Sequence, residues 1–153
     1  MKKWLIPLIV ILLYSVSNVG CSNSLPTATP VYIKDVVAYQ EGSDGIVVYF
    51  VLADRNGEET TASGTVHLKI TQDTRSYIYT LYEKTFSVDK SDFHNTTVGS
   101  GAFERKRILC SFGRIPYSSF NTYPSGDFPS GDVIVEFTTE NGQVLTGSDT
   151  ILY

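Results

Sequence analysis

The chain has 153 residues, of which 12% are aromatic and 18% charged, whereas about 25% are charged in an average soluble domain. Its 12 basic and 16 acidic residues give a formal charge of −4; once Lys2 and Lys3 of the N-terminal segment are set aside, 10 bases face 16 acids, or −6. An acidic domain excludes general nucleic-acid binding, which needs Lys and Arg to neutralise phosphates.

The N-terminus has the pattern of an export signal. A short positive start, Met1 to Lys3, precedes an almost unbroken apolar run from Trp4 to Val16. Because a membrane-spanning helix needs about 20 apolar residues, this shorter run is typical of a signal peptide. The sequence therefore predicts a signal peptide over residues 1–20.

The signal ends at a cysteine. Val19-Gly20-Cys21 resembles the lipobox of bacterial-type lipoproteins, although Asn18 stands where that family has Leu or another apolar residue. The resemblance implies cleavage before Cys21 and a diacylglyceryl group on its thiol. Residues 21–30 are rich in Ser, Thr, Asn and Pro, which predicts a lipidated polar tether. The alternative is an uncleaved N-terminal anchor, and both interpretations place the protein outside the cytoplasm, in the cell envelope, with the membrane as a partner.

The remainder, residues 31–153, reads as one β domain. Apolar and polar residues alternate with period 2, and Asn-Gly turns separate the runs. The expected strands are 31–39, 46–53, 65–71, 76–82 (continuing or restarting at 85–88), 103–112, 132–139 and 144–153, with a polar loop at 89–101 and an irregular stretch at 114–131. Seven or eight strands without a helix predict an all-β antiparallel sandwich of immunoglobulin or fibronectin III type. An antibody-type domain would have the pattern Cys…Trp…Cys. Because the only Trp is Trp4, in the predicted signal peptide, the fibronectin-like or bacterial immunoglobulin-like version fits better.

This segment also resembles a group of uncharacterised archaeal and bacterial surface lipoproteins with immunoglobulin-like sandwiches. The residues that carry the resemblance are 46–50 before 54–58, then 61–66, and 137–147 near the end. It implies a fold and no activity.

Few residues suggest metal binding or catalysis. Asp54, Asn56 and Glu58 have the oxygen ligands that Ca²⁺ prefers, but Asp-x-Asn-Gly is also a strong hairpin turn, which we favour. Cys110 lies in an apolar strand and is expected to be a buried thiol without a disulfide partner. His67 is expected on a solvated strand face. The sequence predicts no metal and no cofactor.

Basic residues gather in one short segment of the acidic domain. Glu104 to Arg107, with Arg114, could meet an anionic headgroup or polymer. Strand alternation would divide this cluster between two faces, so a solvated strand end is favoured. Asn95-Thr96-Thr97 fits the N-glycosylation acceptor pattern.

The stretch from 116 to 131 is the most unusual. It carries a near-repeat of Pro-Ser-Gly-Asp with interleaved aromatics at Tyr117, Phe120, Tyr123 and Phe128. Aromatics on a loop held by a rigid sandwich are a common means of binding, including to sugars, and these four are the candidate binding residues. The alternative, which we favour, is that the loop covers the sandwich end and its rings plug the core.

The sequence contains no nucleophile-elbow or zinc-protease motif, so we expect that the protein is not an enzyme. The sequence predicts a membrane-tethered interaction or spacer module, with an envelope protein or glycan as its partner. The alternatives are a small-solute, sugar or metal-binding envelope lipoprotein or, less favoured, a hydrolase.

Overall fold

A computed structural model describes residues 25–74, 77–98, 101–121 and 130–152. Within them lie nine strands and three short 3₁₀ turns: β1 (Tyr32–Gln40), β2 (Gly45–Ala53), β3 (Glu59–Thr60), β4 (Gly64–Asp73), β5 (Ile78–Val88), η1 (Lys90–Asp92), β6 (Phe93–Val98), η2 (Gly101–Phe103), β7 (Arg105–Pro116), η3 (Tyr117–Ser119), β8 (Ser130–Thr139) and β9 (Val144–Leu152).

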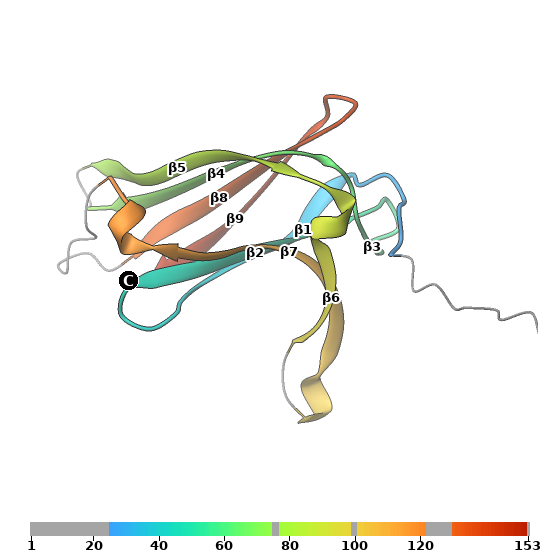
Figure 1. Ribbon diagram of the computed structural model, residues 1–153, viewed down its shortest axis with the longest axis horizontal. Helices are drawn as coiled ribbons and strands as arrows, with labels where there is room; N and C mark the ends of the chain where they lie inside the picture. The colour runs from blue at the N-terminus through green and yellow to red at the C-terminus, as the bar shows by residue number, and fades with distance from the viewer. Residues whose placement is uncertain (1–24, 75–76, 99–100, 122–129, 153) are drawn as a thin grey trace, which may run out of the picture.

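The strands form two antiparallel sheets. The first has the order β1-β2-β7-β6, with β3 paired to β2, and the second has the order β5-β4-β8-β9. The sheets face one another across the core (Figure 1). The predicted all-β, two-layer architecture is confirmed.

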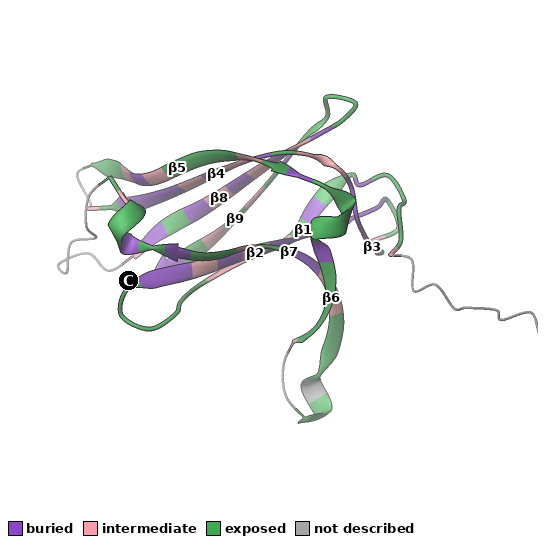
Figure 2. Cartoon of the chain, viewed as in Figure 1, coloured by how far each residue is buried: buried purple, intermediate pink, exposed green. Residues whose placement is uncertain are grey.

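Period-2 alternation decides which residues face the core. In β4, Val66, Leu68 and Ile70 are fully buried, while His67 and Lys69 between them are only partly covered; Figure 2 shows the same alternation. β2 is buried along almost its whole length, as expected of a central strand.

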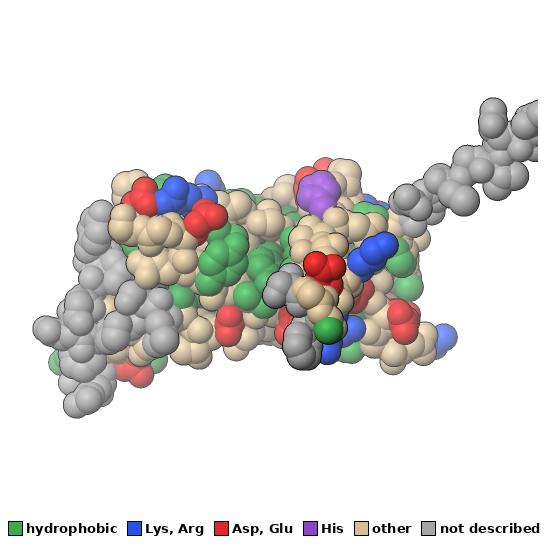
Figure 3. All heavy atoms as spheres, turned by 90° about the horizontal axis from the view of Figure 1, so that it is seen from below, with side chains coloured by type: hydrophobic (Ala, Val, Ile, Leu, Met, Phe, Trp, Pro, Cys, Tyr) green, Lys and Arg blue, Asp and Glu red, His purple; other side chains and the backbone are tan. Residues whose placement is uncertain are grey.

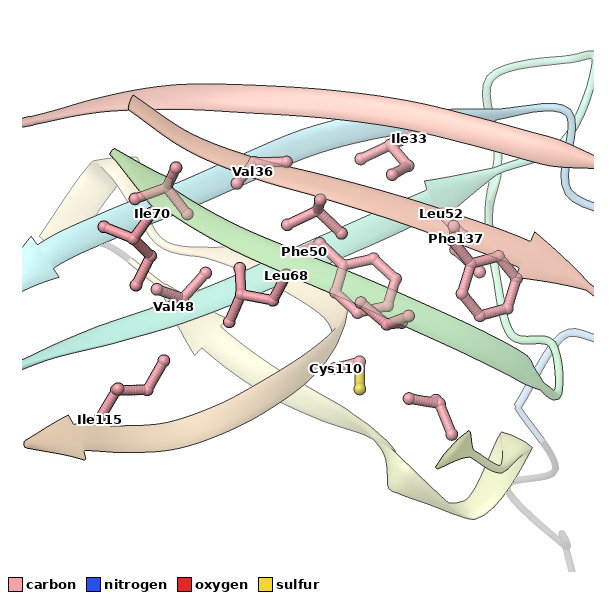
Figure 4. Close-up of a cluster of buried hydrophobic side chains, with 14 of the residues drawn as sticks. Ile33, Val36, Val48, Phe50, Leu52, Leu68, Ile70, Cys110, Ile115 and Phe137 are labelled. Carbon is pink, nitrogen blue, oxygen red and sulfur yellow. The ribbon is translucent and has the colours of Figure 1, made fainter. Parts of the chain in front are cut away.

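Phe50 lies at the centre of the core (Figure 4). Its ring centroid is 5.7 Å from that of Phe93, 5.6 Å from Phe112 and 5.9 Å from Phe137. These rings come from β2, β6, β7 and β8, so one aromatic cluster joins both sheets. Burying such side chains stabilises a fold by about 1.5–3 kcal/mol each.

The two sheets approach closely at one margin, where β1 lies beside β9. The backbone N–H of Ala38 donates to the Asp149 carboxylate at 2.9 Å. A Cβ on Gly147 would lie 2.7 Å from Cγ2 of Ile33 and 2.9 Å from Cγ2 of Val36. Gly147 is therefore required by close packing.

Two strand boundaries differ from the sequence prediction. The segment 89–101, predicted to be a polar loop, contains β6, and β7 continues to Pro116, beyond the predicted end at 112. Residues 94–97 are exposed on both faces, so no alternation marks them as a strand. β5 is one continuous strand, of the two possibilities the sequence left open.

The molecule has two distinct ends (Figure 1). The segment that precedes β1, the connection from β2 to β4 and the β8–β9 turn lie at one end, which we call the near pole. The β1–β2 turn, η3 and the end of β9 lie at the other, the far pole. The β6–β7 hairpin projects away from the sandwich.

Candidate functional site: the open seam between the sheets

The margin opposite β1 and β9 is open. In the described part of the chain, β5 pairs only with β4, and the pairing of β6 with β7 ends at Phe93 and Cys110. From Ser111 to Pro116, β7 is paired only on its β2 side. We call the gap between β5 and this part of β7 the open seam.

A shallow cleft of about 260 Å³ lies in the seam. It is lined by Phe86, Ser87, Val88, Asp92, His94, Cys110, Ser111 and Phe112. Figure 3 shows hydrophobic side chains at the surface in the middle of the side from which the hairpin projects.

Aromatic rings form one wall of the cleft. The Phe86 and Phe112 centroids are 5.2 Å apart, and Phe112 stacks at 21° on the buried ring of Phe50. Lys84 Nζ lies 5.1 Å from the Phe86 centroid, within cation–π range. Core aromatics thus continue outward to the surface.

Cys110 lies at the base of the cleft but is 3% exposed. Burial raises the pKa of its thiol to about 12, and the Asp92 carboxylate adds to the shift. Because the thiolate is the nucleophilic form, the protonated thiol is suited to packing. The predicted buried, unpaired thiol is confirmed among the described residues.

The first part of the predicted binding loop closes the far end of the seam. Tyr117 is 5% exposed, and its ring packs edge-on against Phe120 at 5.3 Å. Phe120 in turn contacts Tyr82 at 5.9 Å, and burial raises the pKa of both tyrosines. The backbone N–H of Asn121 donates to Leu81 O at 2.7 Å. Tyr117 and Phe120 therefore pack against the end of the core, as in the interpretation favoured from the sequence. Tyr123 and Phe128 lie outside the described residues.

The outer face of the second sheet carries a titratable cluster that the sequence did not indicate. His67 Nε2 lies 2.9 Å from Glu83 Oε1, and Nδ1 lies 3.2 Å from Glu136 Oε2. The three residues come from β5, β4 and β8, so only strand pairing reveals the cluster. In the described part of the chain, no three His, Cys, Asp or Glu side chains are arranged to hold a metal ion.

The members of the basic cluster make different contacts. Arg107 donates to Glu59 at 2.5 Å and to Asp35 at 2.8 Å, whereas Arg105 and Lys106 are exposed. Arg114 is paired with Asp44 of the β1–β2 turn, at the far pole. The ion pairs of Arg107 tie β7 to β1 and β3.

The Asp54 turn is a hairpin turn between β2 and β3, as favoured from the sequence. Asp54 Oδ1 accepts the backbone N–H groups of Asn56 at 2.8 Å and of Glu58 at 3.0 Å. Gly57 supplies the positive φ of +83°. The carboxylate therefore stabilises the turn.

At the near pole, the second half of the predicted tether is bound to the domain. Thr60 Oγ1 donates to Ala28 O at 2.6 Å, and Thr61 donates to Pro26 O through both its hydroxyl and its backbone N–H, each at 3.0 Å. We call this set of contacts the threonine clamp. Cys21 itself lies outside the described residues.

Comparisons with protein-family models, curated proteins and solved structures found no match to this chain. Among the residues that the structure describes, no helix has the length and apolar character needed to cross a membrane.

Proposed function

We propose that this protein is a non-catalytic interaction or spacer module of the cell envelope, anchored to a membrane through lipid on Cys21, with a sandwich of immunoglobulin or fibronectin III type. Strand order supports the fold type. With β1, β2, β4, β5, β6, β7, β8 and β9 lettered A, B, C, C′, D, E, F and G, the sheets read A-B-E-D and C′-C-F-G. An immunoglobulin constant-type sandwich has A-B-E-D against C-F-G.

The threonine clamp is the observation that carries the functional proposal. It holds Pro26 and Ala28 against the near pole, and Pro26 follows Cys21 by only five residues. Five extended residues reach at most about 18 Å. Lipid on Cys21 would therefore keep the near pole beside the bilayer and direct the far pole outward, where its loops could meet an envelope protein or a glycan.

The reactive groups support a non-catalytic role. The Cys110 thiol is buried with a raised pKa, and His67 is bound on both ring nitrogens by carboxylates on an open sheet face. A cysteine reacts as its thiolate, which the raised pKa of Cys110 disfavours, and both ring nitrogens of His67 already contact carboxylates.

The anchor is tested by replacing Cys21. The wild-type chain from membranes is expected to have a lipid-modified N-terminus at Cys21 by intact mass, and Cys21→Ala is expected to remain as an unprocessed precursor without lipid. A mature N-terminus elsewhere would contradict the anchor.

The orientation is tested with two fluorescent labels in the anchored protein. A dye at Asn141→Cys on the near pole is expected to transfer energy strongly to acceptors in the lipid headgroups, and one at Ser118→Cys on the far pole only weakly. Equal transfer from both sites would contradict the proposed orientation and leave the anchor result untouched.

The cleft favours a second candidate, a small-solute or sugar-binding lipoprotein. Exposed ring surface at Phe86 and Phe112 lies beside polar Asp92 and His94, the combination that holds a sugar. The cleft is slightly smaller than the about 300 Å³ at which typical ligand pockets begin, so it suits a single sugar ring. Titration with monosaccharides should shift the amide resonances of Phe86 and Phe112 and leave exposed Val144 unchanged; no shifts would exclude this function.

A further inference from the structure

The outer strand of the projecting hairpin has an unusually open surface. β6 pairs only with β7 in the described part of the chain, and Asn95, Thr96 and Thr97 are all exposed. Figure 2 shows the hairpin mostly in the colour of exposed residues. The Asn95 side chain forms no hydrogen bond to any described residue, so its amide can be modified without loss of a contact.

We infer that Asn95 is an N-glycosylation site. Asn95-Thr96-Thr97 is the Asn-x-Thr acceptor sequence, and no other Asn in the chain has Ser or Thr two positions later. The inference rests on the extracytoplasmic location in the proposed function, because glycan transfer to Asn-x-Thr takes place on exported chains.

The side chains of β6 are arranged so that a glycan and the cleft do not compete. His94 lines the cleft. Because successive side chains of a strand point to opposite faces, Asn95 and Thr97 share the face turned away from it. A glycan on Asn95 would therefore leave the open seam accessible.

The strand also gains protection from the modification. β6 is an edge strand whose outer backbone groups have no partner strand in the described part of the chain, and such edges can pair with other chains. A bulky, solubilising glycan beside this edge blocks such pairing.

The reaction is a glycosyl transfer without oxidation or reduction. The donor is an oligosaccharide linked through phosphate or pyrophosphate to a membrane polyprenol. The bond from the anomeric carbon to the phosphate oxygen breaks, a bond from that carbon to Asn95 Nδ2 forms, and the amide proton leaves with the released polyprenyl phosphate or pyrophosphate.

The test uses the full chain isolated from the membranes of the cells that make it. Intact mass and peptide mapping should find a glycan on the peptide that contains Asn95. Asn95→Gln and Thr97→Ala should abolish it completely, whereas Thr97→Ser, which keeps the hydroxyl, and Thr96→Ala, at the unconstrained middle position, should retain it.

An unmodified Asn95 would overturn the inference, as would a glycan that persists in Thr97→Ala. The same mass spectrum reports the lipid on Cys21. A lipidated chain without glycan rejects only the glycosylation site, and a chain without either modification rejects the proposed anchor as well.

Discussion

Replacing Thr60 with Val tests the threonine clamp with almost no change of shape. Thr60 is fully buried, and its hydroxyl donates to Ala28 O at 2.6 Å and to Pro26 O at 3.3 Å. A hydrogen bond contributes about 1 kcal/mol net. Pro26 O keeps its two hydrogen bonds from Thr61. Because Ala28 is exposed, water can solvate its freed carbonyl, so the expected loss is about 1 kcal/mol and little more.

The loss should be local. The backbone N–H of Thr61 donates to Pro26 O, so this proton exchanges with solvent when the clamp opens. A loss of 1 kcal/mol corresponds to about fivefold faster opening. Hydrogen exchange followed by NMR should show that acceleration at Thr61 and unchanged protection at core amides such as Val66.

The matched control is Thr65→Val, which makes the same chemical change at an exposed position of β4. Its Thr61 exchange should equal that of the wild type. Unchanged exchange in Thr60→Val would refute the clamp, and faster exchange throughout both sheets would show that Thr60 stabilises the whole domain rather than the tether.

Two further predictions concern packing and pH. Gly147→Ala should lower the free energy of unfolding by about 1–3 kcal/mol through overpacking, since its Cβ would lie less than 3.0 Å from Ile33 and Val36. Denaturant melts measure the change, and the control Thr146→Ala, at an exposed position, should stay within about 0.5 kcal/mol of the wild type. An unchanged stability of Gly147→Ala would mean that β1 and β9 separate freely. Folded Cys110 should resist alkylation at pH 8 and react promptly in denaturant, because its folded pKa is about 12 against 9.0 unfolded. The folded state then binds the thiol proton more tightly, so the free energy of unfolding falls as pH rises through the window from about 9 to 12. Cys110→Ala should lack the part of this decrease that comes from the thiol. An identical dependence of stability on pH in the two proteins would contradict the raised pKa of Cys110.

Local sequence patterns account for most of the fold. Alternation identified β1, β2, β4, β8 and β9 to within about two residues, because a half-buried strand must place apolar residues on every second position. Asp54 to Gly57 marked its turn because Asn-Gly accepts positive φ at low cost. Cys110 could be assigned to the interior on the same ground.

Long-range pairing decided the features of the candidate site. The sequence did not predict β6, because an edge strand that is exposed on both faces shows no alternation of apolar and polar residues. The seam depends on where the pairing of β6 with β7 stops, and the cluster of His67 with two glutamates depends on register between strands up to 69 residues apart.

The same distinction holds at the near pole. Composition predicted a polar tether over residues 21–30, since Ser, Thr and Pro bury little apolar surface. Composition did not reveal that Thr60 and Thr61, more than 30 residues further on, bind Pro26 and Ala28. The sequence by itself determined most of the strands and their turns, because these follow from neighbouring residues. Only the tertiary structure decided the open seam and the clamp, because each arises from hydrogen bonds made or left unmade between distant segments.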